Sequence, residues 1–219
     1  IARGETLIAS VTSERGKGGD LSRAQAPIIT KGDTITLKRE APIVSYAGQA
    51  DGFLVLMRAS ETAPETDTRL VWVHKSDKAH AVKGGWNTMG MRGTQSVPID
   101  FEAELPANRV LPKSFKEMGD RTLLPLGVLG FASVWAGAAR GILDEVTHRT
   151  RLRGGAADPV LAQLARFRAQ LDIVDSYILQ LAERVDHARA TPGDPGSGYW
   201  IALNPTLSLT HTSHCRRST

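Results

Sequence analysis

The sequence lacks the cysteines and the long apolar runs that define several protein classes. Its 219 residues include one cysteine, Cys215, so no disulfide forms within the chain and a reducing, cytoplasmic location is expected. No uninterrupted apolar run approaches about 18 residues, which predicts no membrane span. No secretory signal is visible.

Neither positive nor negative charge is in large excess. The formal net charge is +4, too small to indicate a nucleic-acid partner, although it favours an anionic ligand such as a nucleotide. Apolar residues make up 41% and charged residues 23% of the chain, a composition typical of a folded domain. The chain opens at Ile1 in strand-like sequence and closes with an aperiodic stretch, 210–219, so we expect both ends to be breaks in a longer protein.

The first half alternates apolar and polar residues with period two, the pattern of half-buried strands. The clearest case is 97–105, and glycine, proline and aspartate clusters separate the runs. The other predicted strands are Leu7–Thr12, Thr34–Lys38, Phe53–Met57 and Leu70–His74. Short strands at this spacing predict an antiparallel β-barrel or sandwich.

The second half changes to helical periodicity. A long apolar helix is predicted over 126–150, ended by Gly154 and Gly155, and a second helix starts at Asp158-Pro159. Apolar residues spaced alternately four and three apart, from Val160 to Val185, form a narrow seam on the second helix. Since a helix pair cannot bury such seams alone, partners are expected from further sequence or another subunit.

Together these patterns predict an α+β fold with three parts. Residues 1–118 form the β domain, 119–190 form part of a helical bundle, and 191–219 form a loop and an aberrant or disordered tail.

Five local motifs follow one another along the chain. Ser-Glu-Arg-Gly-Lys-Gly-Gly-Asp at 13–20 is similar to the Thr-Glu-Pro-x-x-Gly-Ser-Asp signature of acyl-CoA dehydrogenases. Arg-Glu-Ala-Pro-Ile-Val-Ser at 39–45 resembles their Gly-x-Lys-x-Trp-Ile-Thr, and the Trp-to-Ser segment at 86–96 their Trp-x-x-x-Gly-x-Arg-x-Thr-x-Ser. A strand and Pro turn at 101–111, and a helix at 137–145, complete the order. The likeness extends over about residues 5 to 189.

The resemblance implies the middle domain and the first bundle helices of an FAD-dependent oxidoreductase. The full-length parent would desaturate an acyl-CoA thioester at its α,β bond and assemble as a homodimer or homotetramer. The electron acceptor and the acyl chain are not indicated.

The resemblance also implies contacts with the cofactor, because a flavin ring needs hydrogen-bond partners at its polar edge and at N5. Residue by residue, the hydroxyls are those of Ser13 and Ser45, with backbone groups of Thr12 and Val44. Arg153, in a basic helix end, would contact the FAD pyrophosphate, although a solvated helix terminus is a sufficient explanation. Likewise, the two serines can be read as ordinary loop and strand-end hydroxyls.

On the substrate side the resemblance points to Gly19 and Arg92, and the sequence departs from the family at Gly19 and at Ile43. Gly19 stands where a serine contacts the acyl-CoA, and Ile43 replaces an aromatic that packs on the flavin. A flavin monooxygenase or N-hydroxylase of the same fold, which needs no acyl-CoA contact, is therefore an alternative. An inactive fragment is another.

No catalytic base is assigned. The resemblance puts the base either late in the bundle or at the position of Gly127, and glycine does no acid–base chemistry. His211, His214 and Cys215 match no zinc spacing, so no metal is expected. The glycines at 16–19 lack the strand-to-helix context of a P-loop.

Overall fold

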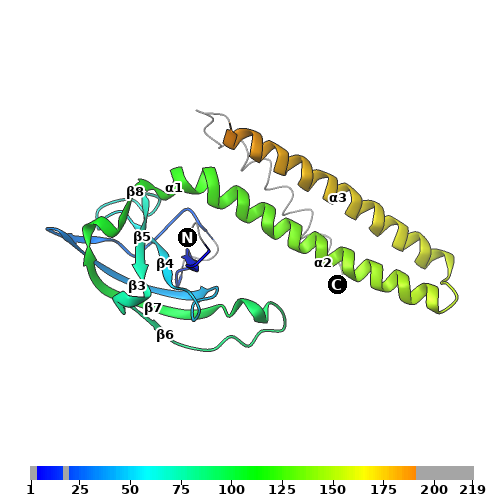
Figure 1. Cartoon of the computed structure of the whole chain (residues 1–219), viewed down its shortest axis with the longest axis horizontal. Coiled ribbons are helices and arrows are strands. Elements are labelled where there is room, and N and C mark those ends of the chain that lie inside the picture. Colours follow the sequence, from blue (N-terminus) through cyan, green and yellow to red (C-terminus); the bar gives the residue numbers. More distant parts are fainter. Residues whose placement is uncertain (1–3, 17–19, 191–219) are drawn as a thin grey trace. The chain divides into compact units, whose positions relative to one another are not determined.

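The chain divides into two units, Ile1–Glu117 and Met118–Thr219; the described residues of the first are rich in strands and those of the second are helical (Figure 1). The structure, a computed structural model, describes residues 4–16 and 20–190. Gly19 and the predicted tail at 191–219 lie outside the described residues.

The first unit contains two four-stranded sheets, ordered β1-β4-β5-β8 and β2-β3-β7-β6. The strands are β1 (Ile8–Val11), β2 (Ile29–Lys31), β3 (Thr34–Val44), β4 (Gly52–Arg58), β5 (Thr68–His74), β6 (His80–Val82), β7 (Val97–Pro106) and β8 (Val110–Ser114). Single helical turns η1 (Lys75–Asp77), η2 (Arg92–Thr94) and η3 (Ala107–Arg109) join them. The α+β class is confirmed. Over the described residues the sheets form no closed barrel.

The core lies between the two sheets, because the period-two pattern turns one face of each strand inward. On β7, Val97, Ile99 and Phe101 are buried, and β4 contributes Phe53 from the other sheet. The rings of Phe53 and Phe101 meet edge to face, with centroids 5.3 Å apart. This geometry is the favoured one for two aromatic rings in contact.

One strand pairing differs from the antiparallel expectation. β1 runs parallel to β4, with Ile8 opposite Gly52 and Val11 opposite Val55. A tight hairpin forces antiparallel pairing, whereas a long connection allows either direction. The connection from β1 to β4 is long, because β2 and β3 of the other sheet lie between them in the sequence. The short strands β2, β6 and β8 were not predicted, since their three to five residues carry little alternation.

The second unit is an antiparallel helix pair, α2 (Leu124–Leu152) and α3 (Asp158–Ala190), preceded by α1 (Phe115–Met118) and a π-helical turn, η4 (Gly119–Leu123). Both long helices were predicted. Gly154 and Gly155 end α2 with φ of 85° and 111°, a backbone region that glycine adopts without steric cost. Arg140 pairs with Asp172 and Asp175 across the two helices.

The predicted seam on α3 is buried only over its second half. Ile178, Leu181 and Val185 pack against the first half of α2 around Ala132, whereas Phe167 is 42% exposed. The sequence predicts no membrane span, but by length and composition α2 could cross a membrane. One such helix is weak evidence for a span, since core helices pass the same test.

Two leucines on α3 test this packing. Replacing Leu181, which is 1% exposed, by alanine is expected to lower the free energy of unfolding by about 2–5 kcal/mol, because a cavity is left between the helices. Leu179→Ala is the matched control. Leu179 is 66% exposed, and its loss should change stability by less than about 0.5 kcal/mol. Urea unfolding followed by helical circular dichroism measures both, and equal losses would contradict the observed packing.

Candidate functional site

A β-bulge near the end of β3 turns Ser45 toward solvent. Ala41 pairs with Ile99 but Val44 pairs with Val97, so β3 advances three residues while β7 advances two. Up to Ala41 the odd-numbered side chains face the core; beyond the extra residue Val44 is buried, while Ile43 and Ser45 are exposed. One added residue exchanges the two faces of a strand, so Val44 rather than Ile43 faces the core, and Ser45 follows it at the surface.

Ser13 is held against the same bulge from the other sheet. It follows β1, and its hydroxyl donates to the carbonyl oxygen of Ile43 at 2.5 Å. The Ile43 N–H lies 3.4 Å from the same hydroxyl oxygen. The structure therefore brings Ser13 to within two residues of Ser45 along β3, on one edge of the unit. The flavin contact assigned to them stays a prediction.

Behind Ser45 three hydroxyl groups form a continuous chain. Ser45 Oγ lies 2.9 Å from Ser96 Oγ, which lies 2.7 Å from Thr94 Oγ1. Thr94 Oγ1 in turn donates to the Met91 carbonyl at 2.8 Å. Ser96 is 4% exposed, so the middle of the chain is buried while both of its ends reach toward the surface.

Three residues around this chain have the left-handed backbone conformation that side chains usually avoid. They are Tyr46 (φ 57°), Met91 (φ 57°) and Gln95 (φ 45°). The Tyr46 N–H donates to the Thr94 carbonyl at 2.8 Å, so the two strained segments are bonded to each other. Such conformations cost of order 1–3 kcal/mol each and tend to gather at functional sites. Their position around Ser45 marks this edge as the candidate site.

The edge also exposes apolar side chains beside its hydroxyls. Ile43 is 53% exposed, Tyr46 46% and Met91 57%. An amphipathic ring system, polar along one edge and apolar on its face, has partners of both kinds here.

Beneath the site lies a buried ion pair that the sequence analysis did not identify. Arg39 is 2% exposed and Glu14 9%, with Arg39 Nη1 at 3.6 Å from Glu14 Oε2. The Arg39 guanidinium also donates to the carbonyls of Thr12 (3.2 Å), Ser13 (2.9 Å) and Leu56. The carboxylate of Glu14 accepts the N–H groups of Gln25 and Ala26, both at 2.8 Å. Arg39 thus holds the backbone that carries Ser13.

Burial lowers the pKa of Arg39 to about 10, and the charge of Glu14 partly opposes this shift. Arg39 therefore remains charged at neutral pH, and Nε of its guanidinium has no hydrogen-bond partner. The sequence did contain a signal for this pair: Ile35, Leu37, Arg39 and Ala41 occupy the same inward face of β3. An arginine at an inward strand position needs a buried acceptor.

The remaining predicted residues are placed as follows. The Thr12 carbonyl accepts from Arg39 and the Val44 carbonyl accepts from the Ala47 N–H at 3.3 Å, so both carbonyls are used within the chain. Arg92 is exposed on η2, and its Nε donates to the Thr88 carbonyl at 2.7 Å. Arg153 is the exposed C-cap of α2 in the helical unit. Its contact with a pyrophosphate stays a prediction.

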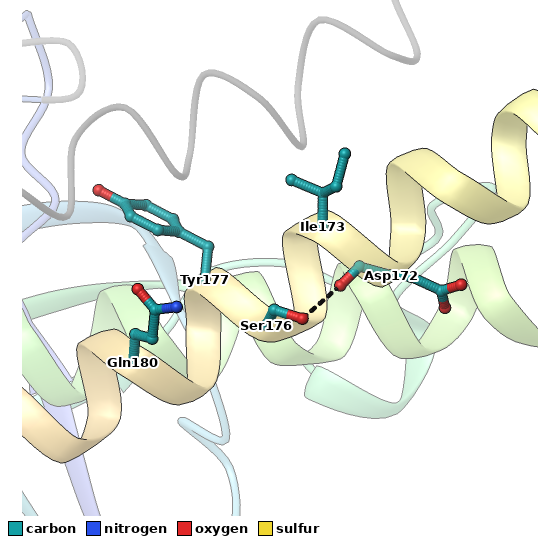
Figure 2. A pocket seen from close by; sticks show the side chains of 5 residues that line it. All are labelled: Asp172, Ile173, Ser176, Tyr177 and Gln180. Atoms are coloured by element: carbon teal, nitrogen blue, oxygen red, sulfur yellow. Dashed lines mark hydrogen bonds between the residues drawn. The ribbon is translucent and has the colours of Figure 1, made fainter.

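No group of three or more His, Cys, Asp or Glu side chains is arranged for a metal ion among the described residues. His211, His214 and Cys215 lie outside them. A shallow depression on α3 is lined by Asp172, Ile173, Ser176, Tyr177 and Gln180 (Figure 2). One helix supplies all five residues, and the Ser176 hydroxyl donates to the Asp172 carbonyl at 2.8 Å.

Known structures resemble this chain throughout its length. Butyryl-CoA dehydrogenase from Megasphaera elsdenii matches with a TM-score of 0.78 at 17% identity, covering 94% of this chain and 54% of that one. A probable acyl-CoA dehydrogenase from Mycobacterium abscessus matches with a TM-score of 0.69 at 18% identity, covering 98% and 61%. The chain has the acyl-CoA dehydrogenase fold. This confirms the resemblance that the order of the five motifs indicated.

The acyl-CoA dehydrogenase fold also serves other flavin enzymes. Dibenzothiophene monooxygenase from Paenibacillus sp. A11-2 matches with a TM-score of 0.74 at 17% identity, covering 96% of this chain and 56% of that one. The chain therefore spans between half and two thirds of the structures it resembles. No family model and no curated protein matches the sequence.

Two glutamates test the buried pair. Glu14→Gln is expected to lower the free energy of unfolding by about 3–5 kcal/mol, because the Arg39 charge is then buried without a counter-charge. Glu40→Gln is the control, since Glu40 pairs with Arg15 on the surface, where both side chains are more than half exposed. That change should cost at most about 1 kcal/mol. Chemical unfolding gives both values, and a Glu14→Gln protein as stable as the control would refute the role of the pair.

Proposed function

We propose that this chain is the flavin-binding part of an FAD-dependent oxidoreductase of the acyl-CoA dehydrogenase type. The observation that carries the proposal is that Ser13 and Ser45, two hydroxyls from distant motifs, both lie beside the β3 bulge. The resemblance assigns these two hydroxyls to the flavin ring, and the acyl-CoA dehydrogenase fold agrees with that assignment.

The residues present suit a flavin. Ser13 and Ser45 provide hydroxyl oxygens for the polar edge of the ring, and exposed Ile43 and Tyr46 provide apolar surface for its face. The bound flavin would supply the hydride-accepting centre for α,β-desaturation of an acyl-CoA thioester. The contribution of this chain is to orient the ring. The proton acceptor is assigned to sequence beyond the described residues, since Gly127 occupies the alternative position.

A monooxygenase of the same fold is the second candidate. Ile43 leaves a small branched side chain where the family has an aromatic, which frees space beside the ring. The similarity to dibenzothiophene monooxygenase, also solved in an FMN-bound form with a TM-score of 0.76, gives this candidate the same structural support. In either case we expect the parent protein to assemble from several copies, and the exposed apolar side chains of the helix pair, such as Leu152, would be covered by another copy or by further helices of the bundle.

Flavin binding is tested by titrating the purified protein with FAD and, separately, FMN. A saturable complex is expected, with the FAD affinity the higher. The double substitution Ser13→Ala/Ser45→Ala should weaken it roughly tenfold to a hundredfold, since two hydrogen bonds of about 1 kcal/mol each are lost. Ser133→Ala is the control, because the Ser133 hydroxyl donates to Leu129 within α2. Absence of binding, or equal affinity in the double variant, would rule the site out.

The two enzyme candidates separate when the flavin-loaded parent protein is kept under anaerobic conditions. Bleaching by an acyl-CoA alone selects the dehydrogenase. Bleaching only by a flavin reductase and its nicotinamide selects the monooxygenase.

A further inference from the structure

Strand β6 reaches the core of its unit through a single side chain. It lies at the edge of its sheet and pairs with β7 alone, where His80 stands opposite Phe101. Ala81 and Val82 are exposed, so His80 is the one residue of β6 that is partly buried. Since residues opposite each other in a sheet share a face, the His80 ring lies on the inward face with Phe101. The attachment of β6 to the core therefore depends on His80.

The surroundings of the His80 ring are apolar. Its centroid lies 4.8 Å from that of Phe53 and 6.4 Å from that of Phe101, and both phenyl side chains are buried. His80 Nδ1 is buried and has no hydrogen-bond partner. A neutral imidazole can leave a lone pair at this nitrogen, whereas protonation puts an N–H on both ring nitrogens. The charged form would bury a cationic donor without an acceptor, which costs free energy.

The carboxylates on the neighbouring elements already have cationic partners. On β7, Asp100 and Glu102 flank the inward Phe101 and so point to the opposite face of the sheet. Lys78, in the turn before β6, is exposed and has the same sign of charge as a protonated His80. Burial therefore lowers the pKa of His80. The ion pairs are Asp100–Lys83 (3.4 Å), Glu102–Lys38 (3.8 Å), Asp77–Arg109 (3.2 Å) and Asp51–Lys75.

We propose that protonation of His80 detaches β6 from the core and loosens the segment 83–96, which carries Thr94 and Ser96 of the candidate site. The direction follows from linkage. A released His80 regains its ordinary pKa of about 6.5 and takes up a proton more readily than the docked side chain. Docking is fully favoured above that pH and weakens as the pH falls below it. The candidate site is therefore complete at neutral pH and opens in acid.

Amide hydrogen exchange on the full chain, corrected for the intrinsic rate at each pH, measures the release. Two N–H groups report on β6: that of Glu102 donates to the Ala79 carbonyl and that of Lys83 to the Pro98 carbonyl, both at 2.9 Å. Below pH ~6.5 their protection should fall by up to about tenfold per pH unit, the limit for uptake of one proton. The amides of the β4–β5 pair in the same unit should lose less.

His80→Phe is the direct variant, because it keeps an aromatic ring against Phe53 and cannot take up a proton. Its β6 amides should lose most of this pH dependence. His148→Gln is the matched control, since His148 is exposed on α2, and it should behave as wild type. Should His80→Phe not fold, His80→Leu answers the same question, because the readout is the change with pH within each protein.

Three results would overturn the inference. One is an NMR titration of the wild-type His80 ring at or above pH ~6.5, which would mean that the phenyl faces attract the cation more than burial repels it. Another is equal loss of protection in β6 and in the β4–β5 pair, since the opening would then involve the whole unit. The third is an unchanged pH dependence in the His80 variants. Failure of flavin to bind would leave the inference standing, because no step of it uses the cofactor.

Discussion

The geometry of the candidate site depends on one buried guanidinium. Arg39 lies on the inward face of β3 and gathers the carbonyls of Thr12 and Ser13 together with the carboxylate of Glu14. A charge at this depth is tolerated only when such partners surround it. Because Glu14 in turn accepts two backbone N–H groups, the segment after β1 is tied both to β3 and to the chain near Gln25. Ser13 consequently reaches Ile43, which lies on the other sheet.

The bulge after Ala41 is a second constraint on the geometry of the site. Arg39 requires the odd-numbered positions of β3 to face inward, whereas a usable Ser45 requires an odd-numbered position to face outward. A regular strand cannot satisfy both, and one extra residue at Pro42–Ile43 resolves the conflict. Proline is well suited to this place, because a bulge leaves one N–H unpaired in the ladder and proline has none.

The features that could be predicted are those set by residues close together in the sequence. Long periodic elements such as β7 and α3 were predicted because burial is encoded in local spacing. β8 was not, since five half-exposed residues leave no pattern, and the parallel β1–β4 pair is a long-range choice. At the site, motif order predicted Ser13 and Ser45 as a pair, but not the bulge that turns Ser45 outward. The partnership of Glu14 with Arg39 also escaped prediction, although an inward arginine on β3 was a readable signal.

The Arg39–Glu14 pair joins residues of the first two motifs. Glu14 matches the glutamate of the Thr-Glu-Pro signature, whereas Arg39 stands where the second motif of the family has glycine. Glycine offers no side chain at that inward position, whereas Arg39 is paired with Glu14 in this chain. Replacing such a pair by apolar residues often leaves stability unchanged, so net stability does not explain its presence. Its directional bonds instead fix where the Ser13 backbone lies, and an apolar side chain has no means of doing so.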